Sequence, residues 1–361
     1  MKFSTLGQAV LLAAWASGLA RADPPSPETG PPAVFYSCQA AGEARPRLFR
    51  EGSLALGSKE PVPLESPLRI GSVSKLFVGT IVLRLVDQDC FSLEDPIQKW
   101  VSGVPGGAEI TLRQLGTHRS GLPDAIWDAE FQKAIVEEPG RFWRAEDILE
   151  SVFRQERVAQ PDERFVYSNA NTILLALAAE KASGRSLERL LAEEIGQPLQ
   201  LEATLSHDRG LRPNRALRAY RHAKPDHPIG YGRVLTEVTA LSASWAHAAG
   251  NFVSTLPDLA KAAPALCSGA LLSEASRKEL HHWRETGQEG WRYGFCIENW
   301  DGLVGHRGDV PGYQAVMAQE QEGPKRTWVV VTTLSNYADG SGPANLFLES
   351  LREGSSPAKA K

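Results

Sequence analysis

The sequence predicts an α+β fold in which one antiparallel sheet is built from both ends of the chain and a helical region is inserted between them. Short β-like segments occur between residues 33 and 69, and three antiparallel strands are expected between residues 293 and 334. Residues 90–230, by contrast, carry mostly helical patterns. Strands at both ends with helices between them bring the two ends together in a single sheet.

The N-terminal part of the expected sheet consists of two segments, residues 34–38 and 47–57. Glycine and proline interrupt this part of the chain, which is typical of hairpins. The C-terminal part comprises residues 293–300, then 304–308 with 313–319, and finally 326–334. A last helix is expected over residues 344–352.

The inserted region begins with a helix over residues 72–88, whose apolar side chains occupy almost every face. A helix that is apolar all round lies at the centre of a fold. Residues 168–184 predict a second helix that ends at Gly184, and residues 186–195 predict a third with Ser186 as its N-cap. Helical patterning returns from residue 256.

The two ends of the chain differ from the middle. Residues 1–22 combine Lys2, an apolar run and a small-x-small site at residues 20–22, which predicts a secretory signal peptide cleaved near Ala22. The alternative is a membrane anchor, although the apolar run is shorter than the roughly 20 residues that a span needs. We therefore expect a secreted or periplasmic protein without a transmembrane segment in its mature form.

The remaining chain divides into three parts. Residues 23–33 are a proline-rich leader, and residues 353–361 are expected to be a disordered tail. Between them, residues 34–352 are expected to form a single domain. Its sheet region covers about 34–71 and 235–352, and its helical region covers about 72–234.

Composition restricts the classes of partner. The 361 residues contain 39 Lys and Arg against 43 Asp and Glu, a formal net charge of −4. This balance gives no electrostatic reason to expect nucleic acid as a partner. The four cysteines are compatible with one disulfide, two disulfides or four free thiols, and neither they nor the histidines have metal-ligand spacing. The sequence thus indicates no metal site and no cofactor.

Ser72 and Lys75 are a candidate nucleophile and base at the start of the central helix. Three positions apart, their side chains lie on one helix face, about 60° apart, whereas Ser74 should pack into the fold. A serine hydroxyl needs a base to remove its proton, and burial lowers the pKa of a lysine. The local pattern alone is weak, because residues 356–359 of the tail also read S-x-x-K.

A second motif is Y167-S-N169, the only Tyr-x-Asn in the chain. Tyr167 lies just before a predicted helix. Its phenol can carry a proton, and the carboxamide of Asn169 can hold an amide. The alternative for Tyr167 is a half-buried structural tyrosine.

A third motif is H306-R-G308, the only His-x-Gly in the chain, on a predicted strand. Alternation places His306 and Gly308 on one face and Arg307 and Asp309 on the other. A glycine in a strand lets a ligand approach the backbone closely. The alternative for His306 is a structural histidine.

Taken together and in this order, the three motifs resemble those of the serine β-lactamase and penicillin-binding-protein superfamily. The resemblance is to its class C-like branch, which includes D,D-carboxypeptidases, penicillin-recognising esterases and D-aminopeptidases. It runs from about residue 34 to residue 352. Accessory stretches also resemble those of the family, and they lie at residues 93–100, 110–124, 165–169, 250–259 and 305–313.

The resemblance implies a β-lactamase/transpeptidase-like fold, with the site between a helix-covered sheet and an all-helical region. It implies that Ser72 is the acylated nucleophile and Lys75 its general base. Tyr167 would carry a proton to the leaving group. The backbone N–H groups of Ser72 and Asp309 would form the oxyanion hole, where the charge of the tetrahedral intermediate develops.

The remaining site residues are implied to bind the substrate. Asn169 would hold its amide, and His306 would stand where other branches have lysine, beside Gly308 on the strand that aligns the substrate. Arg307 and Asp309 depart from the family pattern. Arg307 could pair with Asp309 or with a substrate carboxylate, and an unpaired carboxylate beside an oxyanion hole opposes the developing charge.

We therefore expect an exported serine hydrolase that acts through an acyl-enzyme on amide bonds. The implied substrates are a small molecule or peptide: a peptidoglycan stem peptide, a β-lactam or an ester. A D-alanyl-D-alanine carboxypeptidase-like or β-lactam-reactive enzyme is the main expectation. An esterase, a weak β-lactamase or an impaired penicillin-binding sensor is the alternative. Trp127, Trp245 and Trp291 are candidate pocket walls, although each could instead belong to the core.

Overall fold

The computed structural model describes residues 31–207, 217–224 and 227–353. The expected signal peptide, most of the proline-rich leader, and residues 354–361 of the expected tail lie outside the described residues. The second S-x-x-K pattern at residues 356–359 lies outside them as well.

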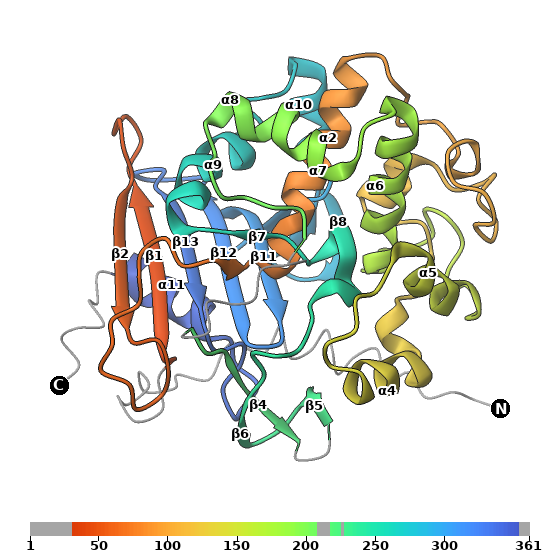
Figure 1. The fold of residues 1–361 in the computed structure, drawn as a ribbon. Coiled ribbons are helices and arrows are strands. Elements are labelled where there is room, and N and C mark those ends of the chain that lie inside the picture. Colours follow the sequence, from red (N-terminus) through yellow and green to blue (C-terminus); the bar gives the residue numbers. More distant parts are fainter. Residues whose placement is uncertain (1–30, 208–216, 225–226, 354–361) are drawn as a thin grey trace.

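Both ends of the described chain contribute to one sheet, as expected (Figure 1). The described residues form eight strands in this sheet, each antiparallel to its neighbours. In spatial order they are β2 (Arg47–Gly52), β1 (Ala33–Gln39), β13 (Thr327–Thr332), β12 (Tyr313–Glu320), β11 (Leu303–Val310), β10 (Glu298–Trp300), β9 (Trp291–Tyr293) and β8 (Arg284–Gln288).

The strand expected over residues 293–300 is interrupted. Strand β9 ends at Tyr293, and β10 begins only at Glu298. Between them Cys296 has a φ of 57°, in the left-handed region, and its N–H donates to the Gly116 carbonyl at 2.8 Å. The chain therefore leaves the sheet here to pack against the helical region.

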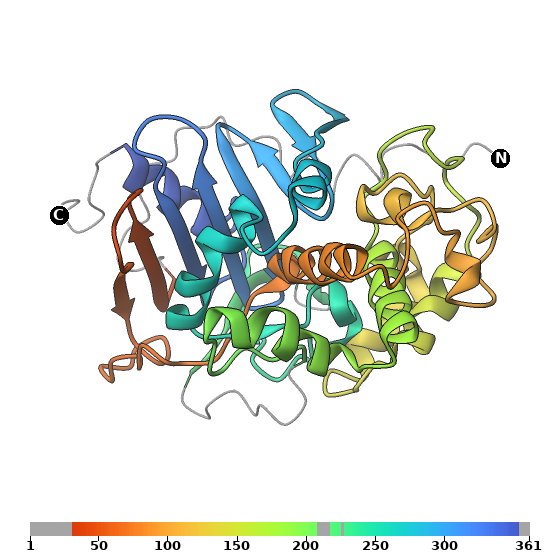
Figure 2. The ribbon, with the colours of Figure 1, turned by 90° about the horizontal axis from the view of Figure 1, so that it is seen from above.

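The two faces of the sheet are covered by different helices. In β13, Val329 and Val331 pack with α9 (Leu256–Ser268), whereas Trp328 and Val330 pack on the opposite face with α11 (Pro343–Arg352). This separation follows from the alternation of side chains along a strand. Figure 2 shows the sheet lying between these two helical layers.

The helix at the centre of the fold is α2 (Ser74–Asp87), and it is buried on nearly every face, as its sequence predicts. Leu76, Phe77 and Ile81 are fully buried. Ser72 precedes it in a single 3₁₀ turn, η1 (Gly71–Val73), rather than in the α-helix itself. The turn lies against β11, which brings the serine close to that strand of the sheet.

The other helices surround α2 (Figures 1 and 2). Helix α6 (Asn169–Ser183) ends at Gly184, whose φ is 68°, and Ser186 caps α7 (Leu187–Leu191) by accepting from the Arg189 N–H, both as predicted. The remaining helical elements are η2 (Ile97–Lys99), α3 (Leu112–Gly116), η3 (Ala125–Trp127), α4 (Ala129–Glu137), α5 (Ala145–Phe153), η4 (Ala192–Gly196), α8 (Gln197–Leu199), η5 (Ser244–Ala249) and α10 (Glu274–Leu280).

The prediction of a helical region over residues 72–234 is wrong near its end. Strands β4 (Tyr220–Lys224), β5 (His227–Tyr231) and β6 (Val234–Glu237) form a small sheet in the order β5-β4-β6. Strand β4 begins beside the main sheet, where the Tyr220 N–H donates to the Thr333 carbonyl at 2.9 Å. A contact between residues so far apart in the chain cannot be predicted from the local sequence pattern. A further short pair joins β3 (Leu68–Arg69) and β7 (Val253–Ser254).

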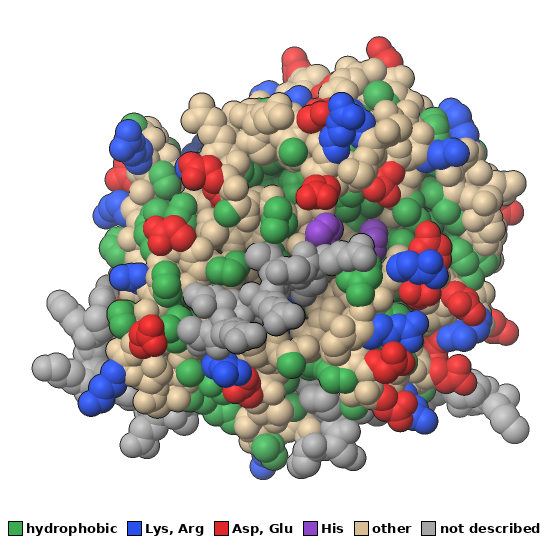
Figure 3. All heavy atoms as spheres, viewed as in Figure 1, with side chains coloured by type: hydrophobic (Ala, Val, Ile, Leu, Met, Phe, Trp, Pro, Cys, Tyr) green, Lys and Arg blue, Asp and Glu red, His purple; other side chains and the backbone are tan. Residues whose placement is uncertain are grey.

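The surface carries charges of both signs. On the face shown in Figure 3, basic and acidic side chains are interspersed among apolar and neutral ones. Among the described residues, no helix is long and apolar enough to cross a membrane, and no cluster of His, Cys, Asp or Glu is suited to a metal ion. The four cysteines are free thiols, which selects one of the alternatives left open by the sequence.

Candidate active site

Ser72 is held where the turn η1 crosses β11. A Cβ on Gly308 would lie 2.1 Å from the Ile70 carbonyl oxygen and 3.0 Å from the backbone nitrogen of Ser72. A Cβ on Gly71, whose φ is 52°, would lie 2.7 Å from the backbone nitrogen of Asp309. Two glycines therefore permit a close approach that brings the N–H groups of Ser72 and Asp309 to the same crossing.

This crossing leads to a stability prediction. In Gly308→Ala the new methyl group meets backbone atoms, which cannot rotate away, so we expect the free energy of unfolding to fall by about 1–3 kcal/mol. Gly140→Ala is the matched control, because a Cβ there meets nothing within 4 Å. Urea unfolding of both variants measures the difference. Equal midpoints for Gly308→Ala and the parent protein would contradict the tight crossing.

Lys75 is fully buried beside Ser72. Its Nζ lies 2.9 Å from Ser72 Oγ, 2.7 Å from Asn169 Oδ1 and 2.9 Å from the Ala249 carbonyl oxygen. Burial lowers the pKa of Lys75 to about 7, against the upward pull of the Asp124 carboxylate. A neutral amine donates only two hydrogens, and the two carbonyl-type oxygens accept both. Its lone pair is then left for the hydroxyl hydrogen of Ser72.

Tyr167 lies against both residues. Its ring centroid is 4.8 Å from Lys75 Nζ, and the Ser72 hydroxyl forms a hydrogen bond with its phenol. Burial raises the pKa of Tyr167 well above its ordinary value of 10. The phenol is therefore protonated at neutral pH and has a hydrogen to donate.

His118 supports the Tyr167 ring, a role that sequence reasoning missed. The two rings stack with centroids 4.3 Å apart. Nδ1 of His118 accepts from the Ser168 N–H at 3.2 Å and from the Asn171 amide at 2.9 Å, which assigns the imidazole hydrogen to Nε2. Burial holds the pKa of His118 well below its ordinary value, so the ring is neutral. The only sequence signal was its position in the loop at residues 118–124.

Asp124 is a second buried residue that sequence reasoning missed. Its carboxylate accepts from the Asn169 N–H at 2.7 Å and from the Ile126 N–H at 3.0 Å. It therefore caps η3 and holds the start of α6, which begins at Asn169, two residues after Tyr167. Burial raises the pKa of Asp124, although these donors oppose the shift.

His306 is placed behind the site rather than in it. It is fully buried; its Nε2 lies 2.9 Å from the Tyr293 hydroxyl and its Nδ1 lies 2.6 Å from the Arg307 carbonyl oxygen. Burial lowers the pKa of His306 to about 4, so the ring is neutral at pH 7. It is not among the side chains that line the pocket at Ser72.

Arg307 has a partner that the sequence did not indicate. Its Nε donates to Glu298 Oε2 at 2.7 Å, and its guanidinium lies over the Trp300 ring at 4.9 Å. The expected pairing was with Asp309 or with a substrate carboxylate. The guanidinium of Arg307 is instead paired with the carboxylate of Glu298, and the Glu298 side chain also lines the pocket.

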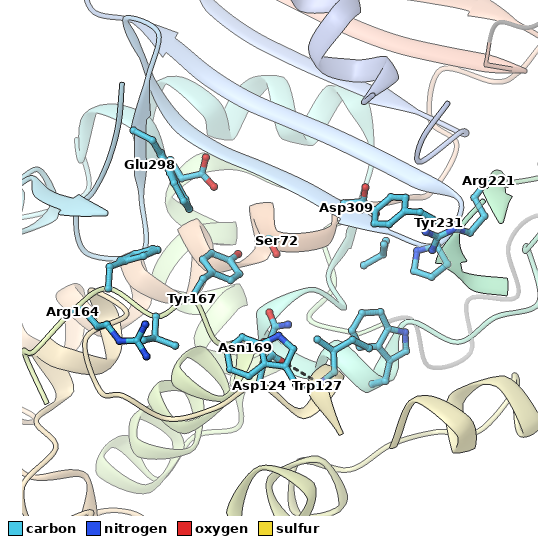
Figure 4. A pocket seen from close by; sticks show the side chains of 17 residues that line it. Ser72, Asp124, Trp127, Arg164, Tyr167, Asn169, Arg221, Tyr231, Glu298 and Asp309 are labelled. Carbon is cyan, nitrogen blue, oxygen red and sulfur yellow. Dashed lines mark hydrogen bonds between the residues drawn. The ribbon is translucent and has the colours of Figure 1, made fainter. Parts of the chain in front are cut away.

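The pocket extends to both sides of Ser72 (Figure 4). Tyr167, Glu298 and Arg164 lie on one side, and Asp309, Arg221 and Tyr231 lie on the other. The three tryptophans proposed from the sequence as pocket walls all line it: Trp127, Trp245 and Trp291.

Comparison with known proteins places this arrangement in a family. The family model described as Beta-lactamase matches residues 12–348. The chain belongs to the beta-lactamase family. It is 28% identical to penicillin-binding protein 4* of Bacillus subtilis (strain 168) over 284 residues, which cover 74% of this chain and 60% of that protein. The family resemblance predicted from the three motifs is thereby confirmed.

A second relative is the D-alanyl-D-alanine-carboxypeptidase/endopeptidase AmpH of Escherichia coli (strain K12). The identity is 31% over 245 residues, which cover 62% of this chain and 63% of AmpH. The chain thus matches about three fifths of the length of these two members of the beta-lactamase family.

Solved structures confirm the fold. The D-amino acid amidase from Ochrobactrum anthropi SV3, complexed with L-phenylalanine, superposes with a TM-score of 0.76 at 24% identity, covering 91% of this chain and 96% of the amidase. A D-stereospecific amidohydrolase from Streptomyces sp. gives the same TM-score at 23% identity. The β-lactamase/transpeptidase-like fold predicted from the sequence is therefore correct.

Proposed function

We propose that this member of the beta-lactamase family is a serine hydrolase that cleaves amide bonds through an acyl-enzyme on Ser72. The main support is the position of Lys75. Its buried amine, with a pKa of about 7, donates to two oxygens and leaves its lone pair for the Ser72 hydroxyl. A buried, neutral lysine at that distance is a base matched to neutral pH.

The proposed first half-reaction forms the acyl-enzyme. Ser72 Oγ attacks the substrate carbonyl carbon while Lys75 Nζ takes the hydroxyl proton. The backbone N–H groups of Ser72 and Asp309 donate to the carbonyl oxygen as it becomes negative. When the carbon–nitrogen bond breaks, Tyr167 donates its phenol proton to the leaving nitrogen and recovers a proton from Lys75. Water then attacks the ester by the same route, releasing the acid and restoring Ser72.

The names of the relatives support substrates that contain D-amino acids. AmpH is named a D-alanyl-D-alanine carboxypeptidase/endopeptidase, and two structural neighbours are named D-stereospecific or D-amino acid amide hydrolases. We therefore propose peptide amides of D-amino acids, in D-alanyl-D-alanine carboxypeptidase-like reactions, together with β-lactams as acylating agents. In this role Asn169 would hold the substrate amide beside β11, and Gly308 would act indirectly, by letting the turn that carries Ser72 lie against that strand.

One observation favours a second candidate, an amidase or endopeptidase. The leaving group must face Tyr167, and Glu298 lies on that side of the pocket. Arg307, which could have bound a C-terminal carboxylate, already pairs with Glu298. A free carboxylate on the leaving group would meet this acidic side chain, so an uncharged leaving group fits better.

Labelling and turnover test the proposal together. We expect a fluorescent penicillin to add one acyl group to the protein, seen by intact mass and mapped to the peptide that contains Ser72. Hydrolysis of a peptide ending in D-alanyl-D-alanine supports the carboxypeptidase-like reaction, whereas faster hydrolysis of the matching D-alanyl-D-alaninamide peptide supports the amidase or endopeptidase. Labelling without turnover indicates a penicillin-binding sensor. Hydrolysis of short-chain p-nitrophenyl esters without labelling indicates an esterase, and neither result supports the amide hydrolase.

The charge of Asp124 provides a prediction about pH. Because this carboxylate pulls the pKa of Lys75 upward, Asp124→Asn should lower it and move the acid limb of penicillin acylation to lower pH. Acylation rates measured from pH 5 to 9 test this. Asp128→Asn is the matched control, since Asp128 caps α4 in the same segment and does not affect Lys75. An unchanged acid limb in Asp124→Asn would contradict the coupling.

Export of the protein is a separate proposal. We infer that residues 1–22 direct secretion and are removed near Ala22, which gives a secreted or periplasmic enzyme. Expression of the full chain in a bacterium, followed by fractionation and intact mass, tests this. The expected product is an exported protein that lacks the first 22 residues, whereas a full-length cytoplasmic product would argue against it.

A further inference from the structure

Two opposite charges face each other across the Asp309 side of the pocket. Arg221 from β4 is 3% exposed, and its guanidinium lies 5.2 Å from the Tyr231 ring. Its Nε is buried without a hydrogen-bond partner. Asp309 from β11 lines the same pocket, and its charge raises the pKa of Tyr231 above the ordinary value. Among the described residues, neither side chain forms a hydrogen bond or close ion pair.

Such groups are costly when they lack partners. The buried Nε–H of Arg221 has lost its water without gaining a protein acceptor, which is unfavourable. Asp309 adds a second cost, because its own N–H belongs to the proposed oxyanion hole and an ionised carboxylate beside that hole opposes the reaction. Both costs disappear when a ligand supplies an anion to Arg221 and a cation to Asp309.

The position of the two groups shows which part of a substrate they would meet. Tyr167 and Asp309 lie on opposite sides of Ser72 (Figure 4). Since the leaving group must face Tyr167 to receive its proton, the rest of the acyl group extends toward Asp309 and Arg221. Trp127 and Trp245 also line the pocket and can enclose the intervening apolar carbon chain.

We propose that this side of the pocket recognises an acyl group that ends in a free α-amino acid, with its carboxylate on Arg221 and its ammonium on Asp309. The inference rests on the proposed acyl-enzyme function and specifies the substrate class. It explains why a carboxylate is tolerated beside the oxyanion hole, because the substrate ammonium neutralises it during acyl transfer.

Four p-nitroanilide substrates, which share the p-nitroaniline leaving group and differ in the acyl group, test the carboxylate and the ammonium separately. The γ-D-glutamyl compound carries both, the 4-aminobutyryl compound only the ammonium, the glutaryl compound only the carboxylate, and the butyryl compound neither. At pH 8 we expect kcat/KM to rise about tenfold or more for each charge. A second series, with two additional methylene groups in each acyl chain, tests whether a longer chain is needed for the charged groups to contact Arg221 and Asp309. No advantage of the doubly charged compound over the neutral one, in either series, would overturn the proposal.

Variants assign each charge to a residue. Arg221→Gln should remove most of the preference for the carboxylate, and Asp309→Asn most of the preference for the ammonium. Each preference is a ratio of two substrates on one variant, so a general loss of activity cancels. Arg164→Gln, which removes a pocket arginine on the Tyr167 side, is the matched control and should keep both ratios. Carboxylate preference that survives in Arg221→Gln would reject the assignment.

Binding separates this inference from the proposed function. Ser72→Ala protein is titrated by calorimetry with D-glutamate and with butyrate, the acids released from two of the substrates. Tighter binding of D-glutamate that is lost in the Arg221→Gln background supports recognition even if no compound is hydrolysed, in which case only the acyl-enzyme proposal fails. Equal binding of the two acids overturns the recognition proposal even if hydrolysis is observed.

Discussion

Ser72→Ala is expected to abolish covalent labelling by penicillin and to lower amide hydrolysis by about 10⁵-fold. The hydroxyl oxygen is the atom that forms the acyl bond in the proposed mechanism, and alanine leaves no atom that can replace it. Lys75 and the backbone N–H groups remain, so only the weak assistance that they give to water survives. Intact mass after incubation with a fluorescent penicillin, and product formation from a D-amino acid amide, measure the two losses.

Ser74→Ala is the matched control for this experiment. Its hydroxyl donates to the Gly71 carbonyl at 2.6 Å and accepts from the Phe252 N–H at 3.2 Å, so it is a buried structural group, as the sequence predicts. We expect this variant to be labelled and to lose about 1–3 kcal/mol of stability, because two polar groups lose their partner. An adduct that persists in Ser72→Ala, or that disappears in Ser74→Ala, would show that Ser72 is not the nucleophile.

The sequence was sufficient for those features that depend on local periodicity. The central position of α2 follows from apolar residues on every face, and the end of α6 follows from Gly184. The proximity of Ser72 and Lys75 follows from a spacing of three residues at a helix start, even though Ser72 lies in a 3₁₀ turn. The small sheet of β4, β5 and β6 was missed because its strands are short and its attachment to Thr333 is a long-range contact.

The supporting residues of the site could not be predicted in the same way. His118 matters because it stacks on Tyr167, and Asp124 because it holds the Asn169 N–H. In both cases the partners are more than 40 residues apart, and neither side of the pair shows a distinctive pattern. The alternation of side chains along β11 correctly placed Arg307 and His306 on opposite faces of the strand. It could not show that Arg307 forms an ion pair with Glu298 on the neighbouring strand.

Lys75→Met is expected to slow acylation by about 10²–10⁴-fold, the usual contribution of a general base. Methionine keeps much of the length of the side chain and suits a buried site, so the fold should tolerate it better than it would tolerate a new charge. Penicillin acylation measured by stopped-flow fluorescence gives the rate. A variant that is acylated as fast as the parent protein would show that another group takes the Ser72 proton.

The pH profile tests the same role without removing the side chain. Lys75 must be neutral to act as a base, so acylation should rise as pH increases through its pKa of about 7. Burial also raises the pKa of Asp309 to about 7, and ionisation of that carboxyl beside the oxyanion hole should slow acylation as pH increases further. The two opposing ionisations predict a narrow bell-shaped profile for an uncharged acyl donor. Asp309→Asn should keep the acid limb and lose the alkaline one, whereas Lys75→Met should lose the acid limb. A parent profile that is flat from pH 5 to 7 would reject Lys75 as the base, because a base that is already neutral at pH 5 cannot have its pKa near 7.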